Sequence, residues 1–246
     1  SLQGAVPNLN IAQGRGSASS VNVFIRGIGQ PDALQTFDPG VGIYVDDVYI
    51  SRIQGSLFSL FDIERLEVLR GPQGTLYGKN STGGAIKIVT KNPSQLTEGA
   101  AEVTYGNEGR AEGKFYLAGP LGGGWSASLS GIVTRLEGFV EDPITGEDFN
   151  DDDSNAFRLK LRNDVSDQLS FTLSADYTHQ QNELSLGRPE ATLISIDLAD
   201  NSVNPLLLAP PPGSEFNYRS RTSFTNGEDQ ELDHWGVSLL ADWDVN

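Results

Sequence analysis

Residues 71–84 read GPQGTLYGKNSTGG, and the interpretation of this glycine-rich stretch decides the fold of the chain. A Gly-Lys pair with hydroxyl residues close behind it is typical of a phosphate-binding loop, whose pattern is G-x-x-x-x-G-K-[ST]. Aligned on Gly78 and Lys79, that pattern requires a glycine at the position of Gln73. It also requires Ser or Thr at the position of Asn80. The spacing therefore argues against a soluble nucleotide-binding enzyme.

Short β-branched segments surround this stretch, and its glycines allow the chain to turn tightly between two of them. Asp46-Asp47 lies between two such segments and predicts a tight hairpin. Residues 56–61 predict a short helix, and Pro93 ends the last segment because proline cannot donate to a strand ladder. The predicted strands are residues 21–26, 41–45, 48–50, 64–70 and 85–91.

From residue 98 onward the sequence changes to a strict period of two, which predicts strands with one apolar and one polar face. Residues 169–178 show the pattern, with Leu169, Phe171 and Leu173 alternating with hydroxyl residues. We expect six such strands, centred on residues 101–105, 111–117, 125–133, 157–162, 169–178 and 235–243.

The alternation alone also fits a soluble antiparallel sandwich. Trp235 and Trp243 favour a transmembrane barrel, because eight residues on one tilted strand span roughly 21 Å, close to the apolar band of about 25 Å. The connections also alternate in length, as in outer-membrane barrels. Connections 119–124 and 163–168 are short, loops 137–153 and 182–230 are long and polar, and the short connection at 106–109 departs from the rule.

The composition limits the possible functions. The chain has 246 residues, a formal net charge of −16 and no cysteine. An acidic chain is a poor partner for nucleic acid, and without cysteine it can form neither disulfides nor thiolate metal sites. No nucleophile, base and orienting residue stand in a catalytic pattern, so we expect neither an enzyme nor a cofactor.

The ordered motifs closely resemble the plug domain of TonB-dependent outer-membrane receptors. They are VLRGPQGTLYG at 68–78, GGAIKIVTK at 83–91, FIRG at 24–27 and VGIYVDDV at 41–48. The resemblance covers about residues 11–93 and implies a membrane β-barrel, here partial with about six antiparallel strands, and an N-terminal mixed α+β plug domain. The expected domains are a plug at 1–93, lacking its N-terminal part, and barrel strands at 98–246.

The resemblance implies active import of a scarce nutrient across the outer membrane of a Gram-negative bacterium. The expected partners are the inner-membrane TonB energising complex, whose coupling segment we expect to be absent from this chain, outer-membrane lipid and lipopolysaccharide, and a small-molecule ligand. An iron–siderophore chelate is the default cargo in that family. The alternatives are a glycan, cobalamin or other organic molecule, or a passive pore or surface-binding protein.

Two sets of candidate site residues follow from the resemblance. The outward loops of the plug supply the expected substrate-binding residues, which are Gln30, Asp32, Gln35, Phe37, Asp38, Arg52 and Gln54. Charged residues in the plug and on the first barrel strands supply the expected plug–barrel contacts, which are Arg26, Glu67, Arg70, Glu102 and Glu112. We expect arginines of the plug to meet glutamates of the barrel, although ordinary solvated charges are the alternative.

No metal site is expected. His179 and His234 stand near predicted strand ends and are interpreted as surface or girdle residues. The acidic run at 148–153 lacks the glycine and the terminal glutamate of a calcium-binding loop, so a solvated loop is favoured over a calcium site.

Overall fold

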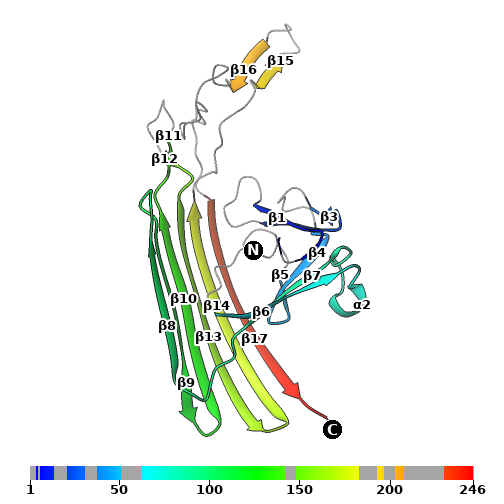
Figure 1. Ribbon diagram of the computed structural model, residues 1–246, viewed down its shortest axis with the longest axis vertical. Helices are drawn as coiled ribbons and strands as arrows, with labels where there is room; N and C mark the ends of the chain where they lie inside the picture. Colours follow the sequence, from blue (N-terminus) through cyan, green and yellow to red (C-terminus); the bar gives the residue numbers. More distant parts are fainter. Residues whose placement is uncertain are drawn as a thin grey trace.

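The computed structural model describes residues 4, 6–13, 21–30, 38–50, 62–141, 148–182, 193–196, 203–207 and 230–245. Six long strands run side by side as a curved sheet, and the small sheets of the N-terminal part lie on one side of it (Figure 1). The helix predicted at 56–61 falls outside the described residues. The domain limits of 1–93 and 98–246 stay predictions.

The N-terminal part contains a three-stranded and a four-stranded sheet, here called the plug sheets. The first has the order β1 (Leu9–Gln13), β2 (Val21–Ile25), β3 (Ile28–Gly29). The second has the order β5 (Val48–Ile50), β4 (Val41–Val45), β7 (Gly84–Thr90), β6 (Ile63–Arg70), and its β4–β7 pair is parallel. Their apolar side chains form one core that includes Val23, Ile25, Val41 and Ile86.

The β4–β5 hairpin forms where the sequence predicts it. Val45 pairs with Val48, so Asp46 and Asp47 are its two turn residues. Both have positive φ angles, 46° and 66°, as a type I′ hairpin turn requires. Aspartate tolerates this left-handed backbone better than most residues do.

The glycine-rich stretch connects β6 to β7 and contains the short helix α2 (Gly74–Tyr77). Gly78 and Gly84 have positive φ angles of 72° and 146°. A Cβ at Gly84 would overlap the carbonyl oxygen of Leu69 and lie 2.9 Å from Cδ1 of Ile25. The glycines therefore permit the predicted tight turn and also a close approach of two strands. Tyr77 packs edge-on against Tyr44.

Six antiparallel strands form the second part, here called the long sheet, and they confirm the predicted number. The strands pair only with their sequence neighbours among these six. They run in the order β8 (Glu98–Tyr105), β9 (Ala111–Gly122), β10 (Trp125–Leu136), β13 (Asp152–Ser166), β14 (Leu169–Asn182), β17 (Gln230–Trp243).

Two connections are tighter than the sequence predicts. Residues 119–124 and 163–168 read as short loops, but β9 extends to Gly122 and β13 extends to Ser166. Backbone pairing in the sheet outweighs the turn-like composition of these residues. At the opposite end, β11 (Val140–Glu141), β12 (Asp148–Phe149), β15 (Leu193–Ile196) and β16 (Val203–Leu207) form two small hairpins within the predicted long loops.

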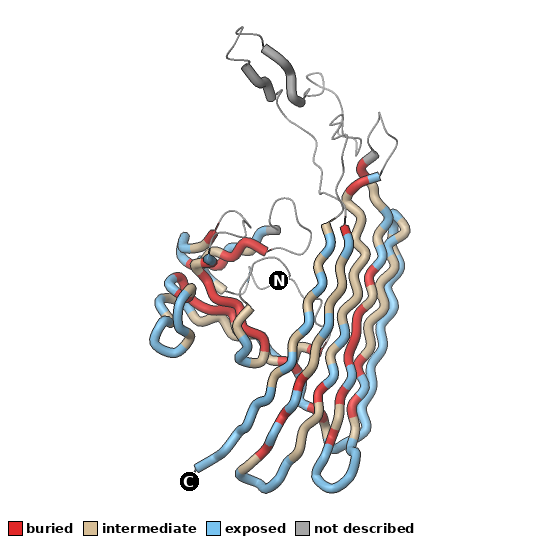
Figure 2. Tube along the Cα trace, turned by 180° about the vertical axis from the view of Figure 1, so that it is seen from behind, coloured by how far each residue is buried: buried red, intermediate tan, exposed pale blue. Residues whose placement is uncertain are grey.

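The long sheet has two unlike faces, as Figure 2 shows by the alternation of buried and exposed residues along its strands. On β10 the side chains of Ser126, Ser128 and Ser130 are buried, whereas Trp125 and Leu129 on the other face remain 45% and 41% exposed. The plug sheets contact the polar face, and the apolar face is left open. No helix among the described residues is long and apolar enough to cross a membrane.

Candidate functional site

Two ion pairs join the plug sheets to the polar face of the long sheet. Lys160 Nζ lies 2.9 Å from Asp46 Oδ2, and Arg158 Nη1 lies 3.3 Å from Asp62 Oδ1. The side chains of Lys160 and Asp62 are 2% and 3% exposed. Charges removed from water to this extent require partners, so these four residues define the interface.

The hairpin turn presents Asp46 to the long sheet. Thr90 donates to this carboxylate twice, from its backbone N–H at 2.8 Å and from its hydroxyl at 2.6 Å. Burial raises the pKa of Asp46, but the charge of Lys160 and the hydrogen bonds from Thr90 outweigh it, so the pKa lies below the ordinary value of 3.8. Asp46 is therefore a carboxylate held ionised between two parts of the protein.

Asp62, which lies one residue before β6, forms the second contact. Its carboxylate accepts a hydrogen bond of 3.0 Å from the hydroxyl of Ser130 in addition to the ion pair with Arg158. Its backbone carbonyl accepts a hydrogen bond of 2.7 Å from the N–H of Lys91. Asp62 thus connects the ends of β6 and β7 to the long sheet.

Two weaker polar contacts extend the interface toward the start of the long sheet. Lys91 Nζ lies 4.9 Å from the ring centroid of Tyr116, within the range of a cation–π contact. The Ser126 hydroxyl donates to the carbonyl of Pro93 at 3.4 Å. The contacts described across the interface are thus mainly polar rather than apolar.

The register of the long sheet explains why long basic side chains can reach the plug. Lys160 stands between Ser128 and Ser174 on the neighbouring strands, and Arg158 stands opposite Ser130. Small hydroxyl side chains leave space for a long side chain that rises from the same face of the sheet. The alternation along β13 and the small neighbouring serines together allow Lys160 and Arg158 to extend toward the plug.

The structure places the predicted plug–barrel residues differently from the expected pairing. Glu67 pairs with Arg65 on its own strand at 2.7 Å. Glu102 and Glu112 both pair with Lys114 on the long sheet, at 3.7 Å and 2.6 Å. The structure therefore does not bring these glutamates to the plug arginines.

Arg26 and Arg70 are exposed, and neither forms an ion pair within the described part of the chain. Their contribution to plug–barrel contact stays a prediction. The observed pairs have the opposite polarity, with aspartates on the plug and cations on the long sheet. The alternation at 157–162 already placed Arg158 and Lys160 on the polar face, but nothing in the sequence indicated their partners.

The predicted substrate-binding residues are only partly described. Gln30 is buried, with 7% exposure. Asp38 is exposed and lies 3.2 Å from Lys79 Nζ. The others, Asp32, Gln35, Phe37, Arg52 and Gln54, lie outside the described residues. The substrate-binding role of all seven stays a prediction.

Comparison with known proteins agrees with this architecture. The family model of the TonB-dependent receptor plug domain matches residues 1–85. The chain is 30% identical over 250 residues to the pesticin receptor of Yersinia enterocolitica, which covers 98% of this chain and 35% of that protein. A vitamin B12 transporter, BtuB of Vibrio vulnificus, is 29% identical over 157 residues, which covers 62% of this chain and 25% of the transporter.

A solved structure shows the same arrangement of plug and strands. The crystal structure of the ferric yersiniabactin uptake receptor FyuA from Yersinia pestis superposes with a TM-score of 0.72 at 25% identity, covering 100% of this chain and 35% of that one. The chain thus spans about a third of the length of these relatives. Its plug sheets, its long antiparallel sheet and these matches show that the chain belongs to the TonB-dependent receptors of the Gram-negative outer membrane, of which it comprises plug sequence and part of the barrel.

Proposed function

We propose that this chain is part of a TonB-dependent importer that carries an iron–siderophore chelate across the outer membrane. The observation that carries the proposal is the polar interface between plug and long sheet, built on the pairs Asp46–Lys160 and Asp62–Arg158. A plug held by ion pairs and hydroxyl contacts can be rehydrated when it moves, which an apolar interface resists. Such a plug closes the lumen at rest and can yield to force.

The proposed cargo is supported by the relatives. The protein of known structure described above is a ferric yersiniabactin uptake receptor. The ferripyoverdine receptor of Pseudomonas aeruginosa shares the fold, with a TM-score of 0.54. Ferric chelates as a class therefore come first among the candidate ligands. The relatives are receptors and transporters, so we propose no catalytic step.

Cobalamin is the second candidate cargo, because one relative is a vitamin B12 transporter. Its alignment covers 62% of this chain, whereas the ferric yersiniabactin uptake receptor matches 100% of it, so the chelate is preferred. Glycans and other organic molecules have no comparable support. A passive pore is disfavoured because the plug sheets lie against the polar face of the long sheet.

We propose two kinds of partner, a protein complex that drives the plug and the lipids that cover the outer face of the barrel. The inner-membrane TonB complex would supply the energy for plug movement. Membrane lipid and lipopolysaccharide would cover the open apolar face, where Val237 and Leu239 are 65% and 70% exposed. Contact with apolar chains would remove this area from water.

Energised uptake tests the proposal. Cells that carry the receptor containing this chain are supplied with ⁵⁵Fe-labelled siderophores and, separately, with labelled cobalamin. We expect accumulation of a ferric chelate that stops when a protonophore collapses the proton gradient. Uptake that continues without the gradient would contradict active transport, and gradient-dependent uptake of cobalamin alone would replace the cargo.

A further inference from the structure

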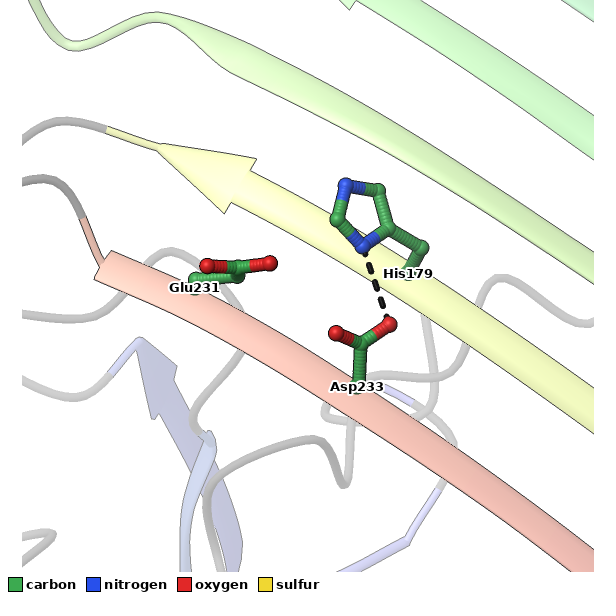
Figure 3. Close-up of side chains that lie close together, drawn as sticks. All are labelled: His179, Glu231 and Asp233. Atoms are coloured by element: carbon green, nitrogen blue, oxygen red, sulfur yellow. Dashed lines mark hydrogen bonds and ion pairs between the residues drawn. The ribbon is translucent and has the colours of Figure 1, made fainter.

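His179, Glu231 and Asp233 form a cluster at the ends of β14 and β17 (Figure 3). The imidazole and the two carboxylates each offer an atom, and these atoms lie within 4.8 Å of one another. His179 and Asp233 are direct partners across the strands, and Nδ1 of the histidine lies 3.0 Å from Oδ1 of the aspartate. Figure 3 shows both carboxylates on the side of β17 that faces the imidazole.

The cluster faces away from the plug, on the open apolar face of the long sheet. Tyr177 and Trp235 pair with each other one step inward on the same face, and both are exposed, by 44% and 75%. In a transmembrane strand, exposed aromatic residues of this kind mark the edge of the apolar layer. The cluster therefore lies just beyond that edge, on the side of the long loops (Figure 1).

The local chemistry favours a positive charge at this cluster. Within the described parts of the chain, neither Glu231 nor Asp233 forms an ion pair with a lysine or an arginine. Two carboxylates this close repel each other. Tyr177 donates a hydrogen bond of 2.9 Å to Asp233 and holds its carboxylate in place. The carboxylate is thus pre-oriented beside the imidazole.

We propose that His179, Glu231 and Asp233 bind a divalent transition-metal ion on the outer face of the barrel. One imidazole nitrogen and two carboxylate oxygens suit zinc or a similar borderline ion, whereas magnesium and calcium prefer oxygen ligands alone. Three protein ligands leave at least one coordination position open for water or a headgroup phosphate. This assignment replaces the sequence-based interpretation of His179 as a simple girdle residue.

The same two strands supply a matched control. His234, the other histidine of the chain, pairs with Asp176 at 3.5 Å on the opposite face of the sheet. That pair belongs to no group of three or more possible metal ligands within the described residues. Replacing His234 thus removes an imidazole from the same strands without touching the proposed site.

Isothermal titration of Zn²⁺ into the detergent-solubilised receptor containing this chain tests the proposal. We expect saturable binding whose affinity falls at least about tenfold in His179→Ala and in Glu231→Gln, and stays within about twofold in His234→Ala. Titration of Mg²⁺ should show weaker binding, and the affinity for Zn²⁺ should fall at acid pH because protons compete for the imidazole.

Thermal unfolding shows whether a loss of zinc binding in a variant results from misfolding. Zn²⁺ should raise the midpoint of the wild-type receptor and of His234→Ala, but not that of His179→Ala, because only a protein that binds the ion is stabilised by it. Zinc binding that is absent, or that is equal in wild type and His179→Ala, would overturn the site. The midpoints of both variants without metal report whether they are folded. Uptake of the labelled chelate is a separate measurement, so failure of the metal site leaves the proposed function standing.

Discussion

The carboxylate of Asp46 in the plug hairpin lies 2.9 Å from the ammonium group of Lys160 in the middle of β13. The lysine side chain is 2% exposed, so its charge is balanced inside the protein rather than by water. The same carboxylate receives two hydrogen bonds from Thr90, the last residue of β7. One residue therefore links the turn, the plug sheet and the barrel strand.

Replacing Asp46 with Asn should weaken the attachment of the plug by about 3 kcal/mol, because it leaves a buried ammonium group without its counter-charge. The double variant Asp46→Asn, Lys160→Met should recover part of this loss. The measurement is a double-mutant cycle on the urea dependence of protease cleavage within the plug. Additive effects of the two single changes would show that the pair is not coupled.

The neighbouring aspartate is the control for this cycle. Asp47 lies 2.6 Å from Lys87, a shorter distance than that of the Asp46 pair, but its side chain is 52% exposed. Exposed pairs contribute little, so Asp47→Asn should cost less than about 1 kcal/mol. Equal losses at Asp46 and Asp47 would indicate that disruption of the turn, rather than loss of the buried pair, is responsible.

The stability of plug attachment should depend on pH through the ionisation of Asp46. Its pKa is lowered from 3.8 in the folded protein because the charge of Lys160 and the bonds from Thr90 outweigh the effect of burial. A carboxylate with a lowered pKa contributes stability that is fully present above its ordinary pKa and is lost as the pH falls through the lowered value. The difference in urea midpoint between wild type and Asp46→Asn should thus stay constant from pH 7 to about pH 5 and shrink only below about pH 4. A difference that already shrinks between pH 7 and pH 5 would mean that burial dominates.

The second buried pair should behave like the first. Asp62→Asn removes the counter-charge of Arg158, whose side chain is 11% exposed, and should lower plug stability by about 3 kcal/mol. Glu64→Gln, two residues along the chain, changes a carboxylate that is 47% exposed and paired with Arg65. That control should cost less than about 1 kcal/mol in the same protease assay. A larger loss at Glu64 than at Asp62 would contradict the interface described here.

The turn after β6 should depend on one glycine. Gly84→Ala places a Cβ against the carbonyl oxygen of Leu69 and forces a non-glycine residue to a φ angle of 146°. The free energy of unfolding of the plug should therefore fall by about 1–3 kcal/mol. Gly74→Ala is the matched control, because a Cβ there meets nothing within 4 Å and the residue begins helix α2. Its effect on the thermal midpoint should be small or favourable. Equal midpoints for the two variants would exclude the proposed close approach.

Much of the architecture could be predicted from local pattern. The period of two identified six strands in the long sheet, and Asp46-Asp47 identified a hairpin. Strand faces follow directly from side-chain alternation, since every second residue points the same way. Strand ends were predicted less well, because residues 119–122 and 163–166 continue the sheet despite their turn-like composition.

The pairing of charges could not be predicted in this way. The sequence indicated that plug and barrel meet through charges, yet the glutamates it favoured, Glu102 and Glu112, bind Lys114 on their own sheet. The residues that do meet, Asp46 with Lys160 and Asp62 with Arg158, are far apart in the chain. The His179, Glu231 and Asp233 cluster likewise exists only because β14 pairs with β17 across a long intervening loop.

The sequence by itself therefore determined the element types, the face on which each strand residue lies and the family, because these depend on neighbours within a few positions. The tertiary structure alone decided which charges are buried together. An ion pair requires two atoms within about 4 Å, and alternation along a strand does not specify how the plug is seated against the barrel or which turn faces which strand.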